Sequence, residues 1–424
     1  MVTNRVIYNN QLLFVGPAPA SGHYFSDPLG NLAQTGIYNL IQPLKRINTF
    51  SYQITANPFR GTQLNTSNNI YDINISQPNV EINFDYYIKD LRNEARMGFY
   101  VKLSPANLDQ LDGGNPYPSG NLLSGFAFSD TYFSFSGDLT QSTNNTFRYP
   151  FKYRDNRNLF LVINPNPDDA IGSNISGFNV LGFGNCYINS YKVRAQVGDI
   201  PRASVGYVAA NVTFYSSGVS GISPYLDPKS GNPNPSVKFN IPNYNTAIEE
   251  QGNSLSVLVP GDITLDLYDY NTTNKTKSNL ILQDSAIQSF NFSLPLERES
   301  LNSLGYELAL DRHINSPITI DFDFTSLFKN LMYTGNLPNH ITQESKYYAV
   351  IKLNKSGIPI VRYDLNGLKL KNYSYDSSIG ANSAINFSFY CDMDVNSFPF
   401  TDGLSMSGAM LGFNYTNFAT NGPF

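Results

Sequence analysis

The sequence predicts an all-β protein of two tandem β-sandwich or partial-barrel domains, with one short helix in each. Tyr and Phe, which favour pleated sheets, number 29 each, and Trp is absent. Gly and Pro, which interrupt strands, number 31 and 25 along the 424 residues. Many stretches alternate apolar and polar residues, the pattern of a strand with one buried face. Together these observations favour sheets over helices.

Two alternating stretches of the first half return in the second half. Residues 47–54 read INTFSYQI, and residues 287–294, which lie 240 positions later (287 − 47), read IQSFNFSL. Residues 80–86 read VEINFDY, and residues 318–324, 238 positions later (318 − 80), read ITIDFDF. The separations differ by two, so the sequence predicts a duplicated domain with a small deletion. Fused copies usually build symmetric assemblies, so the duplication also bears on function.

A short helix is predicted after the second of these strands in each copy. Residues 88–97 read IKDLRNEARM, the best helical stretch of the chain, and Gly98 ends it. In the second copy, residues 325–333 read TSLFKNLMY, with Thr325 or Ser326 as a plausible N-cap. A strand followed at once by a helix in both copies supports the duplication.

Three further pairs of segments extend the match. They are 159–163 with 347–351, 188–193 with 370–375, and 211–215 with 386–390. The separation falls from 238 to 182, so copy one holds about 56 extra residues (238 − 182). Most belong to residues 104–157, and an insertion of this length is usually functional. We interpret it as a projecting hairpin or surface insertion.

These matches set the domain boundaries. Copy one is predicted at 1–216 and copy two at 253–424, where the tail after residue 397 is apolar enough to dock on a neighbour or on the domain itself. Residues 217–252 are rich in Gly, Ser, Pro and Asn, and they predict an extended, surface-exposed linker.

Charge and cysteine content exclude several classes of protein. Charged residues make up only 14% of the chain and the net charge is −5, which disfavours a basic stripe that grips nucleic acid. Two cysteines, Cys186 and Cys391, cannot form a disulfide framework, and each is predicted to be a buried free thiol. The first residues lack the anatomy of a signal peptide, and no apolar run is as long as a membrane span. We therefore expect a protein made in the cytoplasm with no membrane partner.

The sequence predicts no enzyme, no cofactor and no metal site. The three histidines, His23, His313 and His340, have no second His or Cys nearby. Residues 403–407 begin like a nucleophile elbow but end in Ser instead of Gly. Residues 392–403 begin like a calcium loop but lack its Gly and its final Glu.

One polar pattern recurs in both copies. Glu81 and Asp85 lie on the polar face of the strand at 80–86, and Asp321 and Asp323 lie on the polar face of its counterpart. Side chains at i and i+2 share a strand face at a spacing of roughly 7 Å. The pattern fits either an ordinary solvated sheet face or an acidic surface common to both copies.

The segment at 184–211, GNCYINSYKVRAQVGDIPRASVGYVAAN, resembles the major tail proteins of tailed bacteriophages. In that family a strand ends in a Val-Gly-x-x-Pro turn, and the next strand alternates small and apolar residues. Residues 5–20 and 47–54 resemble the family too. Copy two departs from it, because residues 379–382 read IGAN where copy one has the turn.

The resemblance implies a tail tube subunit, a structural virion protein of a phage tail made in the cytoplasm of a bacterial host. Tube domains of the family are β-sandwiches with a flanking helix, and their sheets join into rings that stack around a DNA conduit. Two fused copies would then imply a homotrimer with pseudo-sixfold symmetry. Its partners would be itself, other tail proteins and passing genomic DNA that is not specifically bound. Glu81, Asp85, Asp321 and Asp323 would line the lumen.

Two other functions fit the same sequence. An adhesin or a carbohydrate-binding fibre component would use the Tyr-, Phe- and Asn-rich loops, mainly 104–157. Another tail, neck or baseplate-proximal ring protein would keep the fold and change the role.

Overall fold

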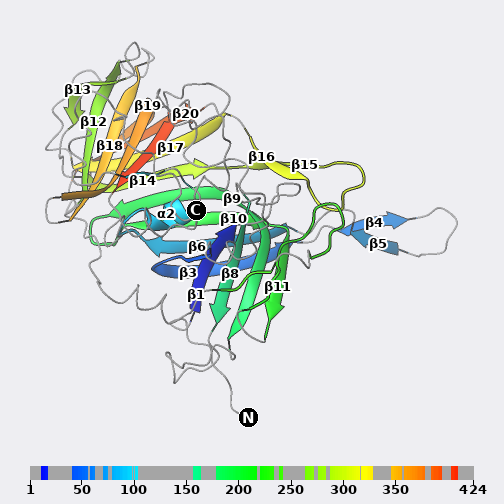
Figure 1. Ribbon diagram of the computed structural model, residues 1–424. Coiled ribbons are helices and arrows are strands. Elements are labelled where there is room, and N and C mark those ends of the chain that lie inside the picture. The colour runs from blue at the N-terminus through cyan, green and yellow to red at the C-terminus, as the bar shows by residue number, and fades with distance from the viewer. Residues whose placement is uncertain are drawn as a thin grey trace, which may run out of the picture.

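The computed structural model describes residues 11–17, 41–55, 58–62, 70–74, 79–97, 99, 101–103, 156–163, 178–216, 220–233, 238–241, 263–271, 276–282, 287–315, 317–327, 345–355, 358–377, 383–393 and 403–408. Strands dominate this part of the chain, and its one α-helix is α2 (Arg92–Met97) (Figure 1). No helix in these segments is both long and apolar enough to cross a membrane. The all-β prediction is confirmed for the described residues.

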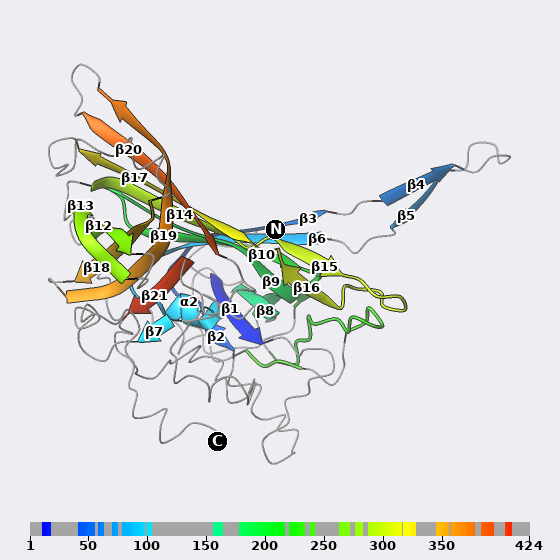
Figure 2. The ribbon, with the colours of Figure 1, turned by 90° about the horizontal axis from the view of Figure 1, so that it is seen from above.

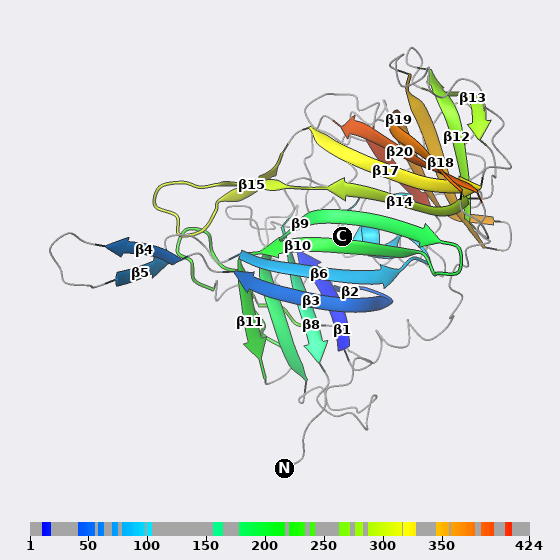
Figure 3. The ribbon, with the colours of Figure 1, turned by 180° about the vertical axis from the view of Figure 1, so that it is seen from behind.

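An antiparallel sheet of eight neighbouring strands forms the centre of the molecule (Figure 3). From one edge to the other, the strands are β3 (Ile47–Thr55), β6 (Asn79–Tyr87), β10 (Arg202–Ala209), β9 (Asn179–Gln196), β14 (Ile287–Pro295), β17 (Ile318–Leu327), β20 (Ala384–Met393) and β19 (Ile358–Asp376). The first four strands come from the first half of the chain and the last four from the second half. The pairing of β9 with β14 joins the two halves.

Two long strands leave the central sheet and continue into two outer sheets. The first part of β9 lies between β8 (Arg157–Ile163) and β11 (Asn211–Tyr215), and β1 (Gln11–Pro17) and β2 (Gln42–Pro43) extend this sheet. The first part of β19 lies between β18 (Tyr347–Lys355) and β21 (Gly403–Gly408), with β12 (Ile263–Asn271), β13 (Thr276–Leu282) and β7 (Val101–Leu103) beyond them. Each half therefore has two sheets that share one long strand.

The core lies between the central sheet and the outer sheets. Strand β17 alternates strictly between buried and partly exposed residues, because apolar side chains occupy every second position from Ile318 to Phe324. Figure 2 shows that the central sheet is curved and that α2, β1, β8 and β21 lie on its convex side. The polar face of the sheet therefore lies on the concave side.

Two hairpins extend from the ends of the central strands. Strands β4 (Pro58–Thr62) and β5 (Ile70–Asn74) project far from the body of the molecule (Figure 1). Strands β15 (Arg298–Leu301) and β16 (Asp311–Ile314) form the hairpin that follows β14. Arg298 holds that hairpin against the first half, since its Nε donates to the carbonyl of Ile188 at 2.9 Å.

The helix predictions are only partly correct. The helix predicted at 88–97 forms over its last six residues, as α2. The helix predicted from Thr325 is wrong at its start, because β17 continues through Leu327 and pairs with β20. Ser326 is fully buried there, so strand pairing overrides its preference for a helix cap. Residues 328–333 lie outside the described residues.

The prediction of an exposed linker is wrong for the described residues at 220–241. Ile222 and Phe239 pair with each other and are fully buried, in one cluster with Phe160 of β8. The tail prediction is confirmed at 403–408, where β21 pairs with β19. That segment is a strand, so it contains no nucleophile elbow. Of the predicted insertion, residues 104–155 lie outside the described residues.

Candidate functional site

The two halves of the central sheet repeat one strand register. Phe50 pairs with Phe84 in the first half, as Phe290 pairs with Phe324 in the second. Both strands are therefore displaced by 240 residues (290 − 50 and 324 − 84). The predicted separation of 238 for the second strand is wrong by two residues, so strand pairing requires no deletion between β3 and β6.

The remaining strands of the sheet share a displacement of 182 residues. Tyr191 of β9 pairs with Val205, and Tyr373 of β19 pairs with Phe387 (373 − 191 and 387 − 205). The predicted match of 188–193 with 370–375 is therefore confirmed. The match of 211–215 with 386–390 is wrong, because β20 takes the position of β10.

The outer strands also shift relative to the sequence match. Leu159 pairs with Phe183, and Ala349 pairs with Leu365, which is the counterpart of Phe183 at 182. Leu159 thus corresponds to Ala349, 190 residues later (349 − 159), where the sequence match expects 188.

Irregularities in the strands repeat as well. The pairing of β3 with β6 skips Asn48, and the pairing of β14 with β17 skips Gln288, its counterpart at 240. The pairing of β9 with β10 skips Asn189, and that of β19 with β20 skips Lys371, its counterpart at 182. Bulges bend a strand locally, so both halves are curved at the same places.

The two edges of this sheet are open and carry apolar side chains. Within the described residues, β3 pairs only with β6, and the last part of β19 pairs only with β20. Tyr52 and Ile54 of β3 are 42% and 52% exposed, and Tyr373 and Tyr375 of β19 are 37% and 56% exposed. An open strand edge is a template for pairing with another chain, so these edges are candidate assembly surfaces.

The four predicted acidic residues lie on the face of the central sheet opposite the core. Glu81 and Asp85 lie on β6, while Asp321 and Asp323 lie on β17. Three strands separate β6 from β17, so the structure places the four carboxylates on one face but in two separate pairs.

Basic residues lie between the two acidic pairs, and the sequence reasoning missed them. Lys192 and Arg194 occupy the same face on β9, and Lys192 lies in one cross-strand row with Asp85 and Asp321. Lys371 Nζ is 3.7 Å from a carboxylate oxygen of Asp321. The face therefore carries mixed charge. The alternation of buried and charged residues from Tyr191 to Ala195 is the signal that could have revealed these cations.

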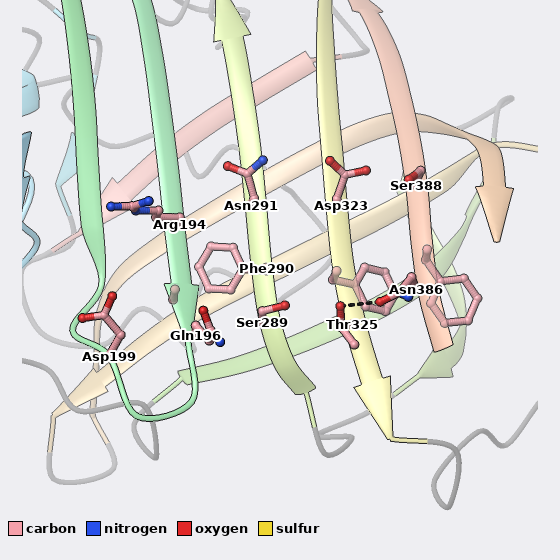
Figure 4. A pocket seen from close by; sticks show the side chains of 13 residues that line it. Arg194, Gln196, Asp199, Ser289, Phe290, Asn291, Asp323, Thr325, Asn386 and Ser388 are labelled. Carbon is pink, nitrogen blue, oxygen red and sulfur yellow. Dashed lines mark hydrogen bonds between the residues drawn. The ribbon is translucent and has the colours of Figure 1, made fainter. Parts of the chain in front are cut away.

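A shallow depression of about 500 Å³ lies on this face. Figure 4 shows Arg194, Asn291, Asp323 and Ser388 along one row of neighbouring strands. The Thr325 hydroxyl donates to Asn386 Oδ1 at 2.7 Å beside them. Hydroxyl and amide groups dominate the lining, and the described residues include no cluster of three or more His, Cys, Asp or Glu able to hold a metal.

A buried carboxyl group lies where the halves meet. The hydroxyls of Tyr86 and Tyr191 donate to Glu94 Oε1 at 2.7 and 3.0 Å, and the Tyr363 hydroxyl is 3.5 Å from that of Tyr191. Burial raises the pKa of Glu94 to about 7, although the tyrosine hydrogen bonds oppose the shift. This cluster connects α2, β6 and β9 with β19 of the second half. Cys186 and Cys391 are buried free thiols, as predicted.

No protein-family model and no curated protein matches this chain. Solved structures that resemble it include a chain in the tail of an empty GTA particle with C6 symmetry (9% identity, 31% of this chain, 91% of that chain, TM-score 0.21). A chain of the sixfold-symmetrised anti-feeding prophage baseplate is 12% identical over 35% of this chain and 94% of its own, with a TM-score of 0.22. The Hcp1 protein from E. coli EAEC 042 is 10% identical over 35% of this chain and 99% of its own, with a TM-score of 0.19.

The chain therefore resembles tail tube and Hcp structures over about a third of its length. These TM-scores are low, so the functional argument below is based on strand pairing and exposure within the chain itself.

Proposed function

We propose that this chain is a structural subunit of a tail tube and has no enzymatic role. The observation that carries the proposal is the repeated register of the central sheet, whose two outer edges are open and apolar. Each half is one tube domain, at 1–216 and 253–424, and the duplication joins two of them through 217–252. The wrong exposure predicted for 217–252 does not alter this division, because the segment still connects the two halves.

Ring closure follows from the geometry of the sheet. Each chain supplies eight strands, so three chains would supply 24 (3 × 8) in a closed barrel with pseudo-sixfold symmetry. Closure pairs every open edge and removes the aggregation hazard that an isolated sheet would carry. Burying the rest of four half-exposed apolar side chains contributes roughly 1 kcal/mol each, about 4 kcal/mol per contact between chains.

The concave face of the sheet would then line the lumen. Glu81, Asp85, Asp321 and Asp323 would share this wall with Lys192 and Arg194. Tight phosphate binding needs clustered cations, and here the cations alternate with carboxylates. Such a wall suits the passage of genomic DNA without specific binding, in a virion tail assembled with other tail proteins in a bacterial host.

Electron microscopy and mass photometry of the purified protein test this function. We expect trimers and rings with a central hole, which stack into tubes. Replacing Ile54 with Asp places a charge on the β3 edge and should leave monomers. The matched control is Leu304→Asp, at a fully exposed site in the β15–β16 turn, which should still form rings. Monomers of the wild-type chain under all conditions would overturn the proposal.

A neck or baseplate-proximal ring would use the same edges, and the number of copies per particle separates that role from a tube. An adhesin would instead bind glycans through 104–157, so glycan binding without rings would favour that alternative.

A further inference from the structure

The pairing of β9 with β14 shows how two tube domains of this protein join. Val193 lies opposite Phe292, and Tyr191 lies opposite Leu294. All four side chains are fully buried. This contact between the halves is a stable joint because each apolar side chain faces another across the two strands.

The open edges of the sheet are the counterparts of this joint. A displacement of 182 takes Tyr191 and Val193 of β9 to Tyr373 and Tyr375 of β19. A displacement of 240 takes Phe292 and Leu294 of β14 to Tyr52 and Ile54 of β3. The side chains that are exposed on the two edges therefore occupy the positions that are buried in the joint.

Polar positions correspond in the same way. In the joint, Lys192 lies opposite Ser293 on the concave face. Their counterparts are Ser374 on β19 and Gln53 on β3, and both are exposed. Each edge thus repeats the alternation of the joint, with apolar residues toward the core and polar residues toward the concave face.

We infer that β3 of one chain pairs with β19 of a second copy in the register of the β9–β14 joint, with Tyr375 opposite Tyr52 and Tyr373 opposite Ile54. This inference rests on the proposed ring, and it specifies which residues meet between its subunits. The occupant of each edge is a second copy because the chain already contains this contact once, between its own halves.

The chemistry of the two joints differs in a way that fits their histories. The internal joint forms as the chain folds, and Val, Leu and Phe supply three of its four side chains. The edges are exposed to water before assembly, and Tyr supplies three of their four side chains. Tyr carries apolar area together with a hydroxyl that water can solvate, so it suits a surface that is first wet and then buried.

Engineered disulfides test the register. In assembled wild-type background, the variant Ser374→Cys with Gln53→Cys should form covalent dimers and trimers on mild oxidation, seen on a non-reducing denaturing gel. The control Ser374→Cys with Ser51→Cys shifts one partner by two residues, beyond the Cα separation that a disulfide tolerates. It should yield at least tenfold less cross-linked product. Lys192→Cys with Ser293→Cys is the positive control and should close within one chain.

Electron microscopy of the same samples separates the two ideas. Rings in which the shifted pair cross-links and the matched pair does not would overturn the register and leave the ring function standing. Monomers without cross-links, while the internal control closes, would overturn both. Rings with efficient cross-linking of the matched pair alone would support both.

Discussion

Replacing Glu94 with Gln should remove a pH dependence that the joint between the halves imposes on stability. Burial raises the pKa of Glu94 from its ordinary 4.5 to about 7 in the folded chain. One pKa unit corresponds to about 1.4 kcal/mol, so the shift is equivalent to roughly 3 kcal/mol. Gln keeps an oxygen that can accept from Tyr86 and Tyr191, and it cannot ionise.

The sign of the effect follows from the bound protons. Between pH 4.5 and 7 the folded chain keeps the Glu94 proton, while the unfolded chain has released it. The stability contributed by the neutral carboxyl is therefore complete below pH 4.5 and is lost as pH rises through 7. The free energy of unfolding of the wild type should fall by roughly 3 kcal/mol more than that of Glu94→Gln over this range.

Urea unfolding followed by circular dichroism at pH 5, 6, 7 and 8 measures the difference. Glu81→Gln, which removes an exposed carboxylate, is the matched control and should follow the wild type. If Glu94→Gln and the wild type change in parallel across the range, then Glu94 is not the buried acid that the structure describes.

Three further predictions concern packing and pairing. Phe292→Ala, at a fully buried site in the β9–β14 joint, should lower the free energy of unfolding by about 3–5 kcal/mol in urea titrations; a loss below 1 would contradict the joint. Gly184→Ala should cost about 1–3 kcal/mol, because a new Cβ would clash with the carbonyl of Pro224; an unchanged melting temperature would show that the close approach is absent. Asp364→Asn should cost about 3 kcal/mol in the same titrations, because its carboxylate accepts from the buried Arg362 at 2.8 Å; a neutral effect would place that pair in water.

Strand positions were largely predictable from the sequence, and strand register was not. The alternation at 80–86 and 318–324 identifies both strands and the face that each buries. Strand side chains repeat every two residues, so sliding one strand by two positions keeps every apolar residue on the same face. The sequence match could therefore settle at 238 when the pairing with β3 and β14 requires 240.

The helix predicted at 325–333 failed for a related reason. Thr325 and Ser326 suit a helix cap as well as a strand, and local sequence does not reveal that β20 lies beside them. Pairing with Asn386 and Ile385 extends the strand instead. The cations on the concave face were overlooked because Lys192 and Arg194 come near Asp85 and Asp321 only when distant strands align.

The sequence by itself determined the all-β class, the alternation of each strand, and which residues belong to apolar and polar faces. Those properties depend on backbone geometry and side-chain polarity, which are local. Only the tertiary structure decided that Phe292 is buried and Tyr52, its counterpart, is 42% exposed. The two positions have the same local pattern, and burial depends on whether a neighbouring strand covers them: β9 covers β14, and a second copy must cover β3.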